Sequence, residues 1–164
     1  MNSPVLLIHH AANRGYVYPP NSIRGLKACL DAAARAVEMD ISPLSGGDFL
    51  LLHDRLLENG TTGSGLIHTR TAEQVSGLFL IWRGAVTDEP VGLLSQALGL
   101  VSRHPYSVEL QLDLKAHTPL DDSEMLRLVA ALQPVKDRVR VTSGADWALR
   151  RLRSLDPDRP PGPA

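Results

Sequence analysis

The sequence of 164 residues holds one cysteine, carries a net charge of -1 and has no long apolar run. One cysteine, Cys29, cannot form an internal disulfide, so nothing points to a secreted protein. The balanced charge gives no electrostatic reason to expect binding to nucleic acid or to an acidic membrane. No apolar run approaches the roughly 20 residues that span a bilayer, and the N-terminus lacks the pattern of a signal peptide. These absences predict a cytoplasmic protein without a membrane span.

The composition is that of a globular domain, with 43% hydrophobic and 21% charged residues. Residues 1–155 are expected to form one domain, because the chain is long enough to bury a core and shows no internal linker. The last nine residues, 156–164, are rich in proline. They are expected to be a disordered tail or the start of a missing strand.

Strand and helix signals alternate from the N-terminus. Short apolar runs predict strands at 4–9, 36–41, 49–53, 107–114 and 138–142. Helical spacing and capping residues predict helices at 22–35, 93–102, 122–132 and 145–155, with a short helix opening at 71–74. This alternation of about five strand–helix units favours a parallel α/β sheet.

An open doubly wound sheet and a (β/α)8 barrel both fit this alternation. Four predicted strands end in ionisable side chains, namely His10, Asp40, His53, and either Asp113 or Lys115. In a TIM barrel the catalytic groups come from the C-terminal ends of several strands. The distribution therefore favours a TIM barrel, and the length predicts that it is truncated after about five units.

Two carboxylates, Glu38 and Asp40, alternate on the second predicted strand and so point to the same face. A parallel strand is usually buried on both faces, and buried carboxylates need partners, of which a metal ion is one. The alternative is a half-exposed strand with solvated carboxylates. Asp113 and Lys115 share a face in the same way, which fits either an anion site beside a metal or an internal ion pair.

Histidines at strand ends can transfer protons near neutral pH. His10 and His53 occupy such positions, and His9 is the competitor of His10, because strand alternation lets only one of the two point into a barrel. His68, His104 and His117 fall in loops or beside helices and are expected to lie on the surface.

Taken in order, these residues resemble the glycerophosphodiester phosphodiesterase family. The family motifs run His-Arg-Gly, Pro-Glu-Asn-Thr, Glu-Leu-Asp-Val, Val-His-His-Asp-Pro with a Thr-Thr-Gly loop, and Ile-Glu-Ile-Lys. The matching segments here are Ile8-His9-His10-Ala11, Pro19-Pro20-Asn21-Ser22, Glu38-Met39-Asp40-Ile41, Leu52-His53-Asp54-Arg55 with Thr61-Thr62-Gly63, and Leu112-Asp113-Leu114-Lys115. Each motif alone is common, but five in this order form a specific signal.

The resemblance implies an enzyme that cleaves glycerophosphodiesters, or lysophospholipid head groups, to sn-glycerol 3-phosphate and an alcohol. It implies Mg²⁺ or Ca²⁺ held by the acidic residues, proton transfer by the two histidines and phosphate binding by the lysine. The residues concerned are Glu38, Asp40 and Asp113, then His10 and His53, then Lys115.

Three departures from the motifs affect the substrate more than the reaction. Ala11 replaces the arginine that follows the first histidine, and Arg14 is the nearby candidate to replace it. Asp113 replaces a glutamate, and Pro20 replaces another. Two alternatives stay open: a sphingomyelinase-D-like lipid phosphodiesterase, and an inactive or fragmentary barrel that acts as a binding protein. Unpaired sheet edges would also allow self-association.

Overall fold

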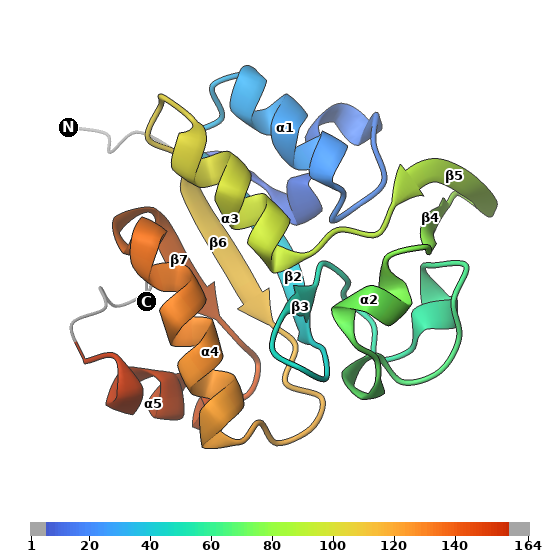
Figure 1. The fold of residues 1–164 in the computed structure, drawn as a ribbon. Helices are drawn as coiled ribbons and strands as arrows, with labels where there is room; N and C mark the ends of the chain where they lie inside the picture. The colour runs from blue at the N-terminus through green and yellow to red at the C-terminus, as the bar shows by residue number, and fades with distance from the viewer. Residues whose placement is uncertain (1–5, 158–164) are drawn as a thin grey trace.

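The computed structural model describes residues 6–157 and contains a parallel sheet covered by helices (Figure 1). The parallel strands, in their order across the sheet, are β1 (Ile8–His9), β2 (Ala36–Pro43), β6 (Glu109–Leu114) and β7 (Val139–Thr142). The longer helices are α1 (Ile23–Asp31), α3 (Leu94–Arg103), α4 (Asp122–Leu132) and α5 (Asp146–Leu155). The α/β fold predicted from the alternation is confirmed.

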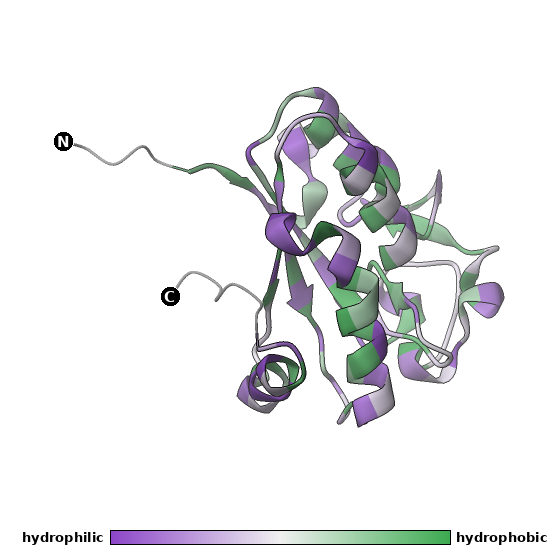
Figure 2. Cartoon of the chain, turned by 60° about the vertical axis from the view of Figure 1, so that its left-hand side comes forward, coloured by the Kyte–Doolittle hydropathy of each residue, from purple (hydrophilic) through white to green (hydrophobic). Residues whose placement is uncertain are grey.

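Alternation along the central strands separates an apolar face from a polar one. On β2 the fully buried Val37, Met39 and Ile41 pack in the main core with side chains of the helices. The helices are amphipathic, with hydrophobic and hydrophilic residues interleaved along them (Figure 2). Because successive side chains of a strand point to opposite faces, Glu38 and Asp40 are directed to the face opposite this core.

The register between β2 and β6 aligns the polar residues of the two strands. Asp40 lies opposite Asp113, and Glu38 lies opposite Gln111. Two residues earlier on β6, Glu109 accepts a hydrogen bond from Gln111 at 2.8 Å and pairs with Arg140 of β7 at 2.9 Å. The polar face therefore carries a continuous series of charged and amide groups that ends at the carboxylates.

The prediction that residues 49–53 form a parallel strand is wrong. Only β3 (Phe49–Leu50) forms there, and it pairs antiparallel with the end of β2. The cause is a tight turn at Gly46 and Gly47, whose φ angles of 95° and 109° are open mainly to glycine. Residues 6–157 thus contain four parallel strand–helix units rather than about five, and His53 lies in a loop rather than at the end of a barrel strand.

The segment between β3 and α3 contains two strands that were not predicted from the sequence. Antiparallel β4 (Phe79–Trp82) and β5 (Ala85–Pro90) form a hairpin, and α2 (Ala72–Val75) begins with the predicted capping box of Thr71 and Gln74. Short 3-10 segments occupy His10–Ala12, Arg14–Tyr16, Leu57–Asn59, Ile67–Thr69 and Gln133–Arg138.

The first helix ends earlier than predicted, and parts of the predicted first strand and tail lie outside the described residues. The first helix ends at Asp31 rather than near 35, because Ala33 turns to a φ of 52° and its amide hydrogen-bonds the carbonyl of Leu30. Residues 4 and 5 of the first predicted strand, and residues 158–164 of the predicted tail, are not described. None of the helices within 6–157 is both long and apolar enough to cross a membrane.

Substitution by alanine at two helical glycines should change the free energy of unfolding in opposite directions. A Cβ at Gly25 of α1 would lie 2.6 Å from the carbonyl oxygen of Ala12, whereas at Gly99 of α3 it would meet only the end of the flexible Arg103 side chain at 3.4 Å. Gly25→Ala is therefore expected to lower the free energy of unfolding by about 1–3 kcal/mol through overpacking. Gly99→Ala should raise it by about 0.5–1 kcal/mol through helix propensity.

Urea denaturation of both variants measures this difference. A Gly25→Ala protein as stable as wild type would show that the turn after β1 does not pack closely against α1. Gly99→Ala serves as the matched control, since it is the same change in another helix.

Candidate active site

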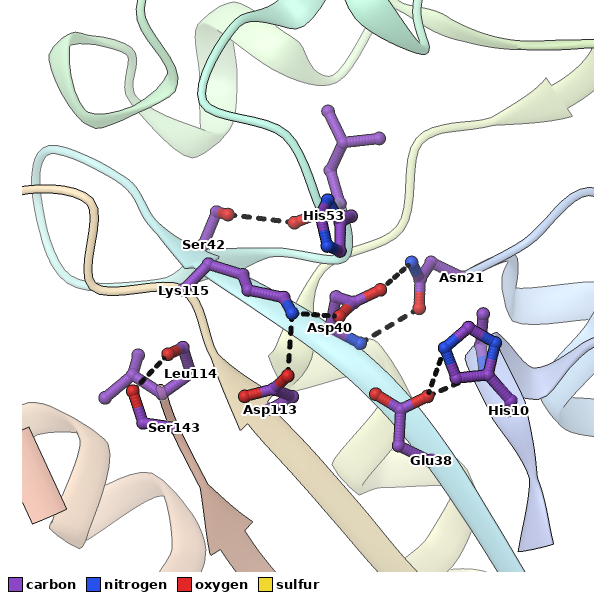
Figure 3. Close-up of polar contacts among 12 residues, drawn as sticks. His10, Asn21, Glu38, Asp40, Ser42, His53, Asp113, Leu114, Lys115 and Ser143 are labelled. Carbon is purple, nitrogen blue, oxygen red and sulfur yellow. Dashed lines mark hydrogen bonds and ion pairs between the residues drawn. The ribbon is translucent and has the colours of Figure 1, made fainter. Parts of the chain in front are cut away.

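Three carboxylates converge on the polar face of the central strands. Glu38 and Asp40 come from β2 and Asp113 from the neighbouring β6, and each offers an oxygen within 4.8 Å of the others (Figure 3). The parallel register that sets Asp40 opposite Asp113 produces this convergence. The predicted cluster of these three residues is therefore present in the structure.

Asp40 is the most buried of the three, and Asn21 holds it in place. The Asn21 amide donates to Oδ2 of Asp40 at 2.8 Å, and its Oδ1 accepts from the backbone N–H of Asp40 at 3.0 Å. Asn21 has a φ of 58°, and its own N–H donates to the carbonyl of Ala11 at 2.7 Å. A buried carboxylate needs such partners, so Asn21 positions Asp40 rather than capping α1. Ser22 is the cap, accepting from the N–H of Gly25.

Lys115 supplies the positive charge of the cluster. Its Nζ lies 2.9 Å from Oδ1 of Asp40 and 2.6 Å from Oδ2 of Asp113. Burial by itself would lower the pKa of the Lys115 ammonium, but its hydrogen bonds to the two carboxylates outweigh burial and raise that pKa. The internal ion pair on β6 therefore exists, and it extends to Asp40 on the next strand.

Glu38 lies at the edge of the cluster next to β1. Its Oε2 accepts a hydrogen bond from the N–H of Ala11 at 2.7 Å, a contact made where Ala11 has a φ of 51°. Burial raises the pKa of the Glu38 carboxyl above its ordinary value, the Ala11 hydrogen bond opposes this, and the charge of Asp40 adds to it. A nearby cation would lower that pKa again.

The donor set fits a divalent cation. Hard cations prefer carboxylate oxygens, and here three carboxylates face a single ammonium group. The Lys115 ammonium lies between Asp40 and Asp113, whose carboxylates stabilise positive charge at that position. The triad is thus able to bind a metal ion.

The structure places His10 rather than His9 beside the cluster. His9 pairs with Val37 in the register of β1 with β2, whereas Nε2 of His10 lies 3.8 Å from Oε2 of Glu38. The His10 side chain is otherwise exposed, at 86% of its maximal area. It is thus accessible to a molecule that approaches the carboxylates.

His53 and Arg14 are less closely connected to the carboxylates. The exposed His53 follows β3 in a loop, where the carbonyl of the preceding Leu52 accepts from Oγ of Ser42 at 2.8 Å. Figure 3 shows the His53 ring drawn above the Asp40–Lys115 pair. Arg14 lies in an exposed 3-10 turn, and none of the polar contacts of the cluster within 6–157 involves its guanidinium.

Comparison with known proteins shows to which family the chain belongs. The model of the Glycerophosphoryl diester phosphodiesterase family matches residues 10–161. The chain belongs to this family. The predicted family membership is thereby confirmed. A glycerophosphodiester phosphodiesterase from Bacillus altitudinis is 27% identical over 154 residues, which cover 89% of this chain and 62% of that protein. Mouse glycerophosphodiester phosphodiesterase 1 is 25% identical over 142 residues, which cover 84% of this chain and 42% of that protein.

Solved structures of relatives share the fold. A putative glycerophosphodiester phosphodiesterase from Galdieria sulphuraria superposes with a TM-score of 0.79 at 20% identity, covering 95% of this chain and 64% of that one. An Oleispira antarctica phosphodiesterase in complex with the product sn-glycerol-3-phosphate superposes with a TM-score of 0.73 at 23% identity. The match covers 92% of this chain and 62% of that one. These neighbours are TIM barrels, of which the chain covers about 60% of the length, and this confirms the prediction of a truncated TIM barrel.

Proposed function

We propose that the chain carries the active site of a metal-dependent phosphodiesterase that cleaves glycerophosphodiesters to sn-glycerol 3-phosphate and an alcohol. The observation that carries the proposal is the cluster of Glu38, Asp40 and Asp113 with Lys115 among them, on the polar face of β2 and β6. Family membership and the product complex of the Oleispira antarctica relative support the substrate class.

The three carboxylates would hold Mg²⁺ or Ca²⁺, which supplies charge neutralisation and polarisation of a phosphoryl oxygen. Lys115 would bind a second oxygen of the same phosphate through its ammonium. Asn21 and the N–H of Ala11 keep Asp40 and Glu38 oriented without a change of conformation. Positioning and charge thus supply most of the catalysis.

Two proton transfers complete the reaction. A water molecule attacks phosphorus in line with the departing alcohol; if the glycerol hydroxyl of the substrate attacks instead, a cyclic phosphate forms and water must open it in a second displacement. One of His10 and His53 accepts the proton of the attacking hydroxyl, and the other gives a proton to the leaving oxygen. The exposed His10 ring beside Glu38 and the exposed His53 both have room for this exchange.

A cytoplasmic location stays a prediction from the cysteine content.

The test is release of sn-glycerol 3-phosphate from glycerophosphocholine by the purified chain, with Mg²⁺, with Ca²⁺ and with EDTA. We expect release with at least one metal and none with EDTA. Choline together with a cyclic phosphate from lysophosphatidylcholine would instead indicate the sphingomyelinase-D-like alternative. No hydrolysis of either substrate, with metal binding retained, would favour the binding-protein alternative.

A further inference from the structure

A hollow beside Lys115 is lined by six polar or cationic residues together with the apolar Pro43 and Ile67. It lies at the end of β2, where the loops that follow β3 and β6 meet. The polar residues that line it are Ser42, Arg55, His68, Lys115, His117 and Thr118. None of its lining residues is an aspartate or a glutamate. The charged residues that line the hollow are therefore cationic, unlike those of the adjoining carboxylate cluster, with which the hollow shares Lys115.

Arg55 adds a permanently charged guanidinium to the lining of this hollow. Its side chain is exposed, and its guanidinium makes no hydrogen bond or ion pair within residues 6–157. By contrast, Arg24 is paired with Asp88, and Arg151 is paired with Asp122. A guanidinium offers five N–H donors that match a phosphate or carboxylate in two-point contact. Arg55 is thus available to an anionic group that enters the hollow.

His68 and His117 add hydrogen-bond donors to the lining of the hollow. The half-buried His68 has a ring N–H donor in either neutral tautomer, so it does not need to be charged to bind an oxygen. Nε2 of His117 lies 3.2 Å from the carbonyl oxygen of His53, to which it can donate. That contact links the segment after β6 to the loop that carries Arg55. The hollow is small, about 10 Å³, and rotation of the exposed Arg55 side chain would widen it.

We infer that this hollow binds a second anionic group of the substrate, carried by the alcohol that leaves. The inference rests on the proposed function, in which the carboxylate cluster and Lys115 take the phosphate that is cleaved. The glycerol half of that substrate is uncharged, so a second negative charge must belong to the leaving alcohol. Its chemical class is a phosphate monoester or a carboxylate, since both accept two hydrogen bonds from a guanidinium.

Two substrates that differ by one phosphate test the inference. Glycerophosphoinositol and glycerophosphoinositol 4-phosphate share the same scissile bond, and we expect a kcat/KM at least about tenfold higher for the second. In Arg55→Gln this ratio should fall close to one. In Arg103→Gln, the same change at the end of α3, the wild-type ratio should remain. Equal kcat/KM values for the two diesters in the wild-type protein would overturn the inference.

A binding measurement separates this inference from the proposed function. The ring C–H signal of His68 in proton NMR should move when sulfate is added to the metal-free protein, and should stay in place in Arg55→Gln. No movement in the wild-type protein would overturn the inference whatever the kinetics show. If sulfate moves the signal through Arg55 but neither diester is cleaved, the proposed function fails and the assignment to a leaving alcohol is overturned with it.

Discussion

Asp40→Asn is expected to lower glycerophosphodiester hydrolysis by at least about a hundredfold, and to remove most of the stabilisation that a divalent metal gives. Asp40 is the buried member of the triad and contacts both Asn21 and Lys115. An amide keeps the shape of the side chain but removes one of the two negative charges closest to the ammonium. The loss should therefore appear in metal binding and kcat, with the fold retained.

The measurements are kcat/KM at saturating metal and the affinity for Ca²⁺ and Mg²⁺ by calorimetry. Asp31→Asn is the matched control, because Asp31 is exposed at the end of α1 and its one ion pair within residues 6–157 is with Lys27. Circular dichroism confirms that both variants fold. An Asp40→Asn protein with more than about a tenth of wild-type activity would contradict the proposed role of the triad.

Lys115→Met is expected to lower the free energy of unfolding in EDTA by about 3 kcal/mol, because Asp40 and Asp113 lose the cation between them. Their carboxylates stand 2.9 and 2.6 Å from the lysine, whose side chain is 17% exposed. A divalent metal should compensate for this loss, so its addition should stabilise the variant more than the wild-type protein. Activity should still fall by about a hundredfold, since the phosphate loses its ammonium ligand.

Urea denaturation with EDTA and with Ca²⁺ measures both parts of this expectation. Lys27→Met removes an exposed ammonium from α1 and should change neither stability nor metal response appreciably. If Lys115→Met were as stable as wild type in EDTA, the ammonium would not be neutralising the carboxylates. If metal stabilised both proteins equally, lysine and metal would not be acting on the same charges.

The central strands and their carboxylates could be predicted because their signal is local. Polar and apolar residues alternate with a period of two along β2 and β6. This alternation places Glu38 and Asp40 on one side of β2, and Asp113 and Lys115 on one side of β6 and its continuation. Parallel pairing then brings the two sets together. The same argument could not choose between His9 and His10, because the choice depends on the register of β1 against β2.

The remaining elements depend on contacts that the sequence does not display. The apolar run at 49–53 is compatible with either strand direction, and the turn at Gly46 and Gly47 decides for the antiparallel one. The β4–β5 hairpin turns at Arg83 and Gly84, with φ angles of 53° and 78°, and lacks the Asn-Gly or Asp-Gly signal of such turns. Asn21 resembles a helix cap by position, and only its distance to Asp40 reveals its role.

Thermal unfolding of the chain in Ca²⁺, in Mg²⁺ and in EDTA tests most directly whether these residues assemble a metal site. A metal that binds only the folded state adds about 2.7 kcal/mol at a hundredfold excess over its dissociation constant. For a chain of this size that is a rise in Tm of roughly 5–10 °C. We predict one cooperative transition that rises with metal in the wild-type protein and not in Asp40→Asn. A sharp transition that is the same with metal and with EDTA would contradict the account.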